Sequence, residues 1–202
     1  MVIFAELPLN ERMAEELGEL KIDFAFQPIF KKKTMELATF LGASKAYYDR
    51  NLKGMLSINS FPSECFDPEE SAVFFRCFPH VAGKMFVEIL EYTDLNFDKW
   101  VLKREQIRSN GIRISLDDYG SGNNYMMAVN IFEPDEVKND RSLISGIHLD
   151  KVKQKHFVEL VEKFHKRGIH ALAEGVECKE ELDFLLTTDV DYLQGYYLGM
   201  PE

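Results

Sequence analysis

The stretch IRISLDDYGSG, residues 112–122, decides how this 202-residue chain folds. Its first seven residues are predicted to form a strand, and that strand ends in two adjacent carboxylates, Asp117 and Asp118. The Tyr-Gly-Ser-Gly sequence that follows is typical of a tight turn. Taken alone, the pattern is an ordinary strand-to-loop turn, so its meaning depends on what the rest of the chain places around it.

Predicted strands alternate with predicted helices along most of the chain. The clearest helix is Lys151–Arg167, where Phe157, Leu160, Val161 and Phe164 recur at helical spacing. Such alternation implies βαβ units around a parallel sheet, so the predicted fold class is α/β. No Gly-x-Gly-x-x-Gly follows the first strand, which argues against an open nucleotide-binding sheet. The predicted strands are 24–30, 37–43, 54–61, 84–90, 112–118, 168–172 and 192–198, and the predicted helices are 11–20, 69–78, 97–110, 151–167 and 179–187.

Polar residues stand at the carboxyl ends of the predicted strands. In an α/β barrel those ends form the single face that carries chemistry. Several carboxylates that converge there would repel one another without cations, and oxygen ligands suit Mg²⁺ or Mn²⁺. Two such ions side by side are a common solution for phosphodiester hydrolysis. The residues concerned are Asn59, Glu88, Asp117, Asp118, Lys138, Glu174 and Gln194.

Composition narrows the class of protein. The hydrophobic content of 46% suits a single domain over residues 1–202. The formal net charge of −10 repels phosphate backbones and so argues against nucleic-acid binding. There is no signal-peptide pattern at the start and no apolar stretch as long as a membrane span, so we expect no membrane association and a cytoplasmic protein.

Cysteine and histidine give no metal signal in the sequence. The cysteines are odd in number and have no close pair, so each is expected to be a small buried hydrophobe rather than a zinc ligand or half of a disulfide. The five histidines show no metal-ligand spacing, and we expect surface or structural roles for them. These residues are Cys65, Cys77, Cys178, His80, His148, His156, His165 and His170.

Seven short motifs, in order, resemble one known family, the EAL domains that hydrolyse cyclic di-GMP. Asp117 to Gly122 closely resembles the Asp-Asp-Phe-Gly-Thr-Gly signature of that family, and 173–177 matches its Ala-Glu-Gly-Val-Glu. The resemblance covers nearly the whole chain and implies a modified (β/α)8 TIM barrel. The other similar segments are Phe26-Gln27-Pro28-Ile29, Ser57-Ile58-Asn59, Glu88-Ile89-Leu90-Glu91, Lys138-Asn139-Asp140-Arg141-Ser142 and Gln194-Gly195-Tyr196-Tyr197.

The resemblance also implies a role for each of these polar residues. Lys138 and Glu174 would be catalytic, with Lys138 orienting or deprotonating the attacking water. Glu91 would anchor the loop after the two aspartates. The implied metal ligands are Asn59, Glu88, Asp117, Asp118 and Glu174, and the implied ligand-binding residues are Gln27, Lys45 and Gln194.

One departure from the family affects the metal site directly. Counted without gaps from Gln27, the glutamate of the Glu-Ala-Leu motif falls on Leu41, which cannot coordinate Mg²⁺. The arginine four residues later falls on Lys45, which keeps the charge but loses bidentate phosphate geometry. Glu36 lies five residues before Leu41 and could replace the lost glutamate only if a shortened hairpin brought it into the site.

A second departure is a shortened segment between the second and third strands. Only 17 residues separate Leu41 from Asn59, and Ala46–Lys53 has room for two helical turns at best. We expect a thin barrel wall on that side, covered by a protein partner or by a second copy of the chain.

Three functions remain open at this point. The first is an inactive EAL domain that acts in bacterial cyclic di-GMP signalling as a nucleotide sensor or protein-binding regulator. The second is a weakly active phosphodiesterase dependent on Mg²⁺ or Mn²⁺ that produces linear pGpG. The third is a protein-interaction module that does not bind the nucleotide.

Overall fold

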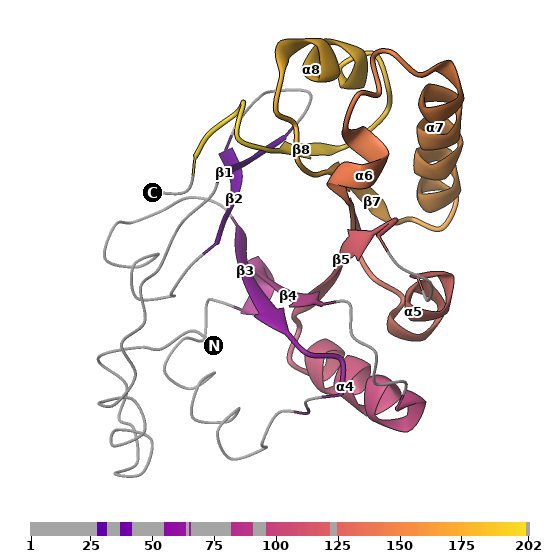
Figure 1. Ribbon diagram of the computed structural model, residues 1–202. Helices are drawn as coiled ribbons and strands as arrows, with labels where there is room; N and C mark the ends of the chain where they lie inside the picture. Colours follow the sequence, from indigo (N-terminus) through magenta and orange to yellow (C-terminus); the bar gives the residue numbers. More distant parts are fainter. Residues whose placement is uncertain are drawn as a thin grey trace.

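The computed structural model describes residues 28–31, 37–41, 55–63, 65, 82–90, 96–121 and 125–200. Within these ranges eight strands form a closed barrel in chain order, seen as a ring in Figure 1. For the first two strands the backbone path is described. The strands are β1 (Pro28–Lys31), β2 (Leu37–Leu41), β3 (Met55–Ser60), β4 (Met85–Ile89), β5 (Arg113–Tyr119), β6 (Glu136–Asn139), β7 (His170–Ala173) and β8 (Tyr192–Gln194).

Strand direction makes this a modified (β/α)8 barrel. β1 runs antiparallel to both of its neighbours, β2 and β8, whereas every pair from β2 to β8 is parallel. The last residue of β2, Leu41, is in register with Ser57 of β3, and residues 42–54 connect the two strands. The structure confirms the α/β class and the barrel predicted from the sequence.

Helices cover the outside of the ring (Figure 1). Asn96 and Asp150 begin α4 and α7 by accepting backbone N–H bonds, as polar caps do. The stripe predicted for α7 is confirmed, because Phe157, Leu160, Val161 and Phe164 are its buried residues. The helices are η1 (Ala82–Lys84, a short 3₁₀ turn), α4 (Phe97–Ser109), α5 (Tyr125–Phe132), α6 (Arg141–Ile144), α7 (Lys151–His165) and α8 (Lys179–Leu185).

Several elements differ from the sequence predictions, and the short helices η1 and α6 were not predicted at all. β6 was not predicted as a strand, because its Glu-Val-Lys-Asn sequence points two charged residues into the barrel and lacks an apolar run. α5 was missed because its Tyr-Met-Met-Ala-Val-Asn-Ile-Phe sequence has no acidic residue in the first turn and no basic residue in the last. The last strand ends at Gln194 rather than at 198, since residues 195–198 form a turn closed by Leu198 N–H and Gly195 O.

Other predicted segments lie outside the described residues. These are the helices at 11–20 and 69–78, residues 24–27 of the first predicted strand, and Ala46–Lys53. Within the described part of the chain, no helix is long and apolar enough to span a membrane.

The two faces of the barrel wall have different chemistry. Apolar strand residues that alternate with the inner ones, such as Val87, Ile114 and Val137, are buried with helix residues such as Trp100 and Phe132. The inner face instead carries ionisable groups at its carboxyl end. The hydrophobic core between sheet and helices therefore fixes the barrel, and the barrel fixes the spacing of the charged residues inside it.

Gly195, directly after β8, allows a close backbone contact. A Cβ added there would lie 2.2 Å from the carbonyl oxygen of Val176 and 2.3 Å from its nitrogen. Val176 N–H also donates to Gln194 O, so the two segments are hydrogen-bonded at this point. A side chain at position 195 could be accommodated only by separating them.

We expect Gly195→Ala to lower the free energy of unfolding by about 1–3 kcal/mol, because overpacking against backbone cannot relax cheaply. Gly83→Ala is the matched control, since no described atom lies within 4 Å of the place its Cβ would take. Urea unfolding of both variants checks this prediction. Equal stability of the two would contradict the contact.

Candidate active site

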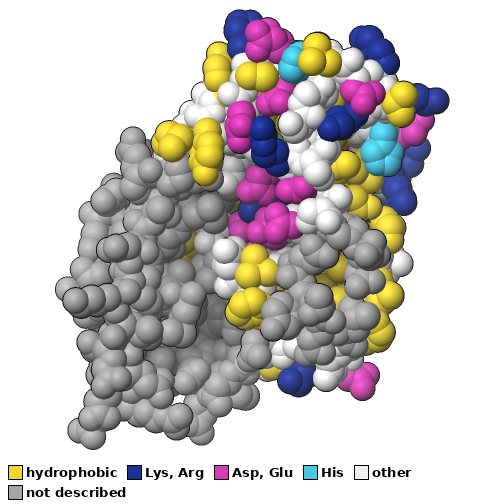
Figure 2. Space-filling model, viewed as in Figure 1, with side chains coloured by type: hydrophobic (Ala, Val, Ile, Leu, Met, Phe, Trp, Pro, Cys, Tyr) yellow, Lys and Arg dark blue, Asp and Glu magenta, His cyan; other side chains and the backbone are white. Residues whose placement is uncertain are grey.

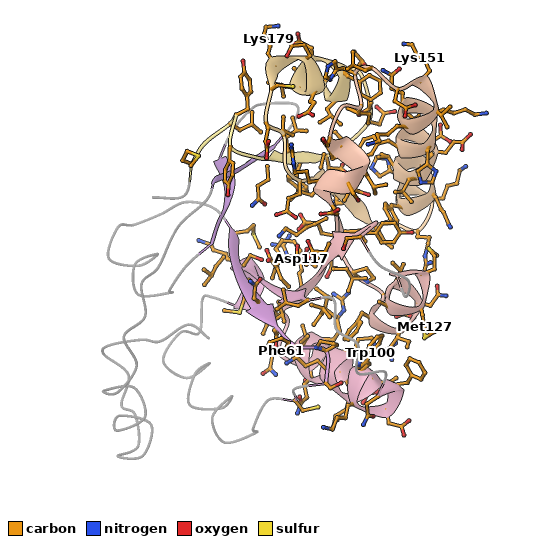
Figure 3. All side chains as sticks on the ribbon, viewed as in Figure 1. Phe61, Trp100, Asp117, Met127, Lys151 and Lys179 are labelled. Atoms are coloured by element: carbon orange, nitrogen blue, oxygen red, sulfur yellow. The ribbon has the colours of Figure 1, made fainter. Side chains whose placement is uncertain are left out.

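Acidic side chains from three strands or strand ends gather at the carboxyl end of the barrel. Figure 2 shows acidic atoms clustered near the centre of this face, and Figure 3 places Asp117 inside the ring of strands. Glu88 comes from β4, Asp117 and Asp118 from β5, and Glu174 from the residue after β7. Parallel strands bring their carboxyl ends to one edge, so residues distant in sequence converge here.

The ammonium group of Lys138 lies among these carboxylates. Its Nζ donates to Asp117 Oδ1 at 2.8 Å and to Glu88 Oε2 at 3.2 Å, and it lies 3.7 Å from Glu174 Oε1. Lys138 is 2% exposed, so the charge is almost fully removed from water. Burial opposes the protonated form, but Glu88, Asp117 and Glu174 raise the Lys138 pKa well above its ordinary value. Lys138 is therefore a cation at neutral pH.

Glu88 and Glu174 experience different surroundings in the same cluster. Glu88 is 2% exposed, and both its oxygens have donors, Ser57 Oγ on one and Lys138 Nζ on the other. Burial raises the pKa of Glu174 to about 7, with Lys138 acting against this and nearby carboxylates adding to it. Within the described residues Glu174 Oε2 is buried without a hydrogen-bond partner. That oxygen is available to a further donor or cation.

A distortion of β5 turns both adjacent aspartates toward the site. Successive strand residues normally point to opposite faces. Here the pairing of β5 with β6 shifts register between Leu116 and Tyr119, and Asp118 has a φ of 55°. One oxygen each of Asp117, Asp118 and Glu174 consequently lies within 4.8 Å of the others. A hard divalent cation fits this all-oxygen donor set, and the unpartnered Glu174 Oε2 supports the same fit.

The segment after Glu174 is held by Arg141. Gly175 has a φ of 78°, and a Cβ there would lie 2.7 Å from Cβ of Arg141. The Arg141 side chain donates to Gly175 O at 2.8 Å and pairs with Glu177 at 2.7 Å. Glycine permits both this backbone conformation and the close approach of Arg141. The position of Glu174 thus depends on a contact made outside the acidic cluster.

Comparison with known proteins agrees with this architecture. The family model described as EAL domain matches residues 43–201. The chain belongs to the EAL-domain family. Over 143 residues, 70% of the chain, it is 29% identical to probable cyclic di-GMP phosphodiesterase PdeG of Escherichia coli K12. The chain covers 27% of the length of that relative.

Solved EAL structures share the fold. A standalone versatile EAL protein from Vibrio cholerae O395, in a form bound to cyclic di-GMP, is 26% identical with a TM-score of 0.73; 91% of this chain and 94% of that one are covered. The manganese and cyclic di-GMP complex of BlrP1 from Klebsiella pneumoniae is 23% identical with a TM-score of 0.76; 91% of this chain and 56% of that one are covered. The EAL barrel inferred from the motifs is thereby confirmed.

The structure of this EAL domain places most of the residues named from the sequence. Asn59 is exposed and in register with Glu88, and Gln194 is 2% exposed at the end of β8. Leu41 is placed by its backbone at the end of β2. The other four residues, Gln27, Glu36, Lys45 and Glu91, lie outside the described residues.

Sequence reasoning missed a second layer of polar groups beneath the acidic cluster of this EAL domain. Glu136 is 5% exposed and accepts from Ser115 Oγ at 2.9 Å, and Ser57 donates to Glu88. Burial raises the pKa of Glu136 to about 7, with Ser115 and Lys138 acting in the opposite direction. A signal was present, because Glu136 lies two residues before Lys138 and so faces the same side of a strand. It could be used only once β6 was known to be a strand.

Removal of the Lys138 ammonium group is expected to destabilise the fold. We predict that Lys138→Met lowers the free energy of unfolding by about 3–5 kcal/mol, because it leaves buried carboxylates without their partner. Lys155→Met is the matched control, since the Lys155 side chain is 79% exposed and its pair with Glu159 spans 3.8 Å. We expect that control to keep almost its full stability in urea. A loss below about 1 kcal/mol for Lys138→Met would show that the site does not depend on the ammonium group.

Glu136 predicts a pH dependence of stability. Its folded pKa of about 7 exceeds the ordinary 4.5, so the unfolded chain loses this proton first as pH rises. The associated stability is present below pH 4.5 and is lost as pH rises through about 7. Glu136→Gln cannot titrate, so we expect it to gain more than about 1 kcal/mol over the parent between pH 4.5 and 8. Unfolding midpoints across that range provide the measurement, and a constant difference would contradict the burial effect.

Proposed function

We propose that this EAL domain binds cyclic di-GMP at the acidic mouth of the barrel without hydrolysing it efficiently. The acidic mouth is the carboxyl end of the barrel that carries Glu88, Asp117, Asp118 and Glu174. The domain would act as a sensor or regulator in cyclic di-GMP signalling. The observation that carries the proposal is the end of β2. Leu41 occupies the position in register with Ser57, and Ser57 bonds to Glu88. A leucine at that place adds no oxygen ligand to the cluster.

The remaining carboxylates support cation binding more strongly than catalysis. Asp117, Asp118 and Glu174 would hold Mg²⁺ or Mn²⁺, which would stabilise phosphoryl oxygens and acidify a bound water. Glu88 already has a donor on each oxygen, Ser57 and Lys138. A missing anionic ligand lowers cation affinity and shifts the remaining ligands, and catalysis is sensitive to small displacements.

Lys138 and Glu174 divide the proton chemistry between them. The high pKa of Lys138 keeps it protonated, so it orients groups and stabilises negative charge rather than taking a proton from water. Without a cation the Glu174 pKa is about 7, so this carboxylate is partly protonated near neutrality and would release that proton on binding a cation. Gln194, buried beside the barrel end, would fix the orientation of the bound groups.

Slow hydrolysis is the second candidate function. One observation favours it: Asp117, Asp118 and Glu174 converge around a protonated Lys138 despite the change at Leu41. In that case Asp117→Asn abolishes turnover of cyclic di-GMP, because it removes an anionic cation ligand and the negative charge closest to Lys138.

As a sensor, the domain would regulate a target that it contacts directly. That target would be a protein partner or a second copy of the chain. The single domain over residues 1–202 and the cytoplasmic location stay predictions. If the protein has no affinity for cyclic di-GMP, the function to accept is a module that binds protein without nucleotide.

Restoring the carboxylate on β2 tests the proposal. We expect the parent protein with Mn²⁺ to show no turnover above background, and Leu41→Glu to raise linear pGpG production about a hundredfold. Leu41→Gln is the matched control, because glutamine has the length of glutamate without its charge, and this variant should stay inactive. Product analysis of all three proteins, and of Leu41→Glu with Asp117→Asn, provides the measurement. Clear turnover by the parent protein, lost in Asp117→Asn, would replace the sensor with the slow enzyme.

A further inference from the structure

A second group of potential metal ligands lies outside the candidate active site. His148, in the segment between α6 and α7, is brought together with Cys178 and Glu181 at the start of α8. One ligand atom from each of the three lies within 4.8 Å of the others. The group shares no residue with the acidic mouth. The sequence did not indicate it, because 29 residues separate His148 from Cys178.

Cys178 is placed unlike a structural cysteine. It was expected to be a buried hydrophobe, but Cys178 and Cys65 are both partly exposed, and Cys77 lies outside the described residues. Cys178 immediately precedes α8, a position where serine, threonine, aspartate and asparagine are preferred as caps. In the described structure its side chain makes no cap hydrogen bond and instead interacts with the Glu181 carboxylate. Neither packing nor capping accounts for a thiol here.

Glu181 is a pre-positioned anion. It is 4% exposed, and its oxygens accept from Gly146 N at 2.8 Å and from Glu177 N at 3.0 Å. Burial opposes ionisation, but these two backbone donors hold the Glu181 pKa below its ordinary value. A carboxylate has about four acceptor positions, so capacity remains for a cation. Because Gly146 N and Glu177 N each hold one Glu181 oxygen, the direction of the remaining acceptor positions is fixed.

His148 supplies the observation that points to a ligand. Its Nδ1 is buried and has no hydrogen-bond partner within the described part of the chain. A buried ring nitrogen without a partner is costly, and native structures normally satisfy such an atom. This atom belongs to the residue that joins the thiol and the carboxylate in the cluster. A bound cation would satisfy it.

We propose that His148, Cys178 and Glu181 form a binding site for a thiophilic divalent cation of the zinc class, with water in the fourth position. Thiolate with imidazole suits Zn²⁺, whereas the all-oxygen mouth suits Mg²⁺ or Mn²⁺. Tetrahedral bonds of about 2.0–2.3 Å separate ligand atoms by roughly 3.3–3.8 Å. The three ligand atoms here lie within 4.8 Å of one another, so they would move together by at most about 1.5 Å to bind one ion. Binding displaces the thiol proton to solvent, since thiolate is the ligand.

The site would link the α6–α7 segment to the chain after Glu174. Glu181 accepts from Glu177 N, and Glu177 pairs with Arg141, which also bonds to Gly175 O. A cation shared by His148 and Cys178 would therefore immobilise the segment that positions Glu174. Zinc binding at this place would influence the mouth through the backbone, without contact with the nucleotide.

The test uses cobalt as a spectroscopic substitute for zinc on the full chain, reduced and stripped of metal. We expect Co²⁺ titration to produce the near-ultraviolet sulfur-to-cobalt charge-transfer band at one equivalent, and Zn²⁺ to displace it. Cys178→Ser should abolish the band, and His148→Gln should weaken zinc binding at least about tenfold. Serine is a favourable residue before a helix, so Cys178→Ser is expected to remain folded, which circular dichroism verifies.

Two controls separate this site from other groups. Cys65→Ser removes the other partly exposed cysteine and should leave the band intact. Asp117→Asn disables the acidic mouth and should also leave it intact, so the result is independent of the proposed function. The inference is overturned if the parent shows no thiolate band, if the band survives Cys178→Ser, or if it is lost in Cys65→Ser.

Discussion

The buried ammonium group of Lys138 holds the acidic mouth of the barrel together. It contacts Asp117 and Glu88 directly and lies close to Glu174, so three strands or strand ends depend on one charge. Carboxylates at this spacing would repel one another in a dry site. The ion-pair cluster lets β4, β5 and the end of β7 present anions to one point, and any added cation must share them with Lys138.

The consequence for function follows from how the oxygens are distributed. Glu88 is committed to Ser57 and Lys138, whereas Asp117, Asp118 and Glu174 lie close enough to share a cation. The distorted end of β5 creates this difference, because it breaks the normal alternation of side chains. In the proposed assignment, Leu41 of β2 stands where a carboxylate is expected, while Asp117, Asp118 and Glu174 would still hold a cation. Affinity without efficient hydrolysis is the pattern that we propose for a sensor.

Much of this was accessible from the sequence. The apolar spacing of Phe157 and its neighbours in α7 and the strand-end placement of Asp117 follow from periodicity and barrel topology. β6 was missed because both of its inward residues, Glu136 and Lys138, are charged, so burial was not visible in composition. The cluster of His148, Cys178 and Glu181 was also missed, since tertiary packing rather than spacing along the chain brings its members together. Local patterns predict elements and their ends; contacts between distant loops require the fold.

Calorimetric titration of cyclic di-GMP into the manganese-loaded parent protein tests the central claim most directly. The account predicts binding near micromolar, about −8 kcal/mol, with the nucleotide recovered intact afterwards. That result would mean that the mouth recognises the ligand without the β2 carboxylate. No measurable binding heat, confirmed by an unshifted melting temperature at excess nucleotide, would contradict it and leave the barrel as a scaffold for protein contacts.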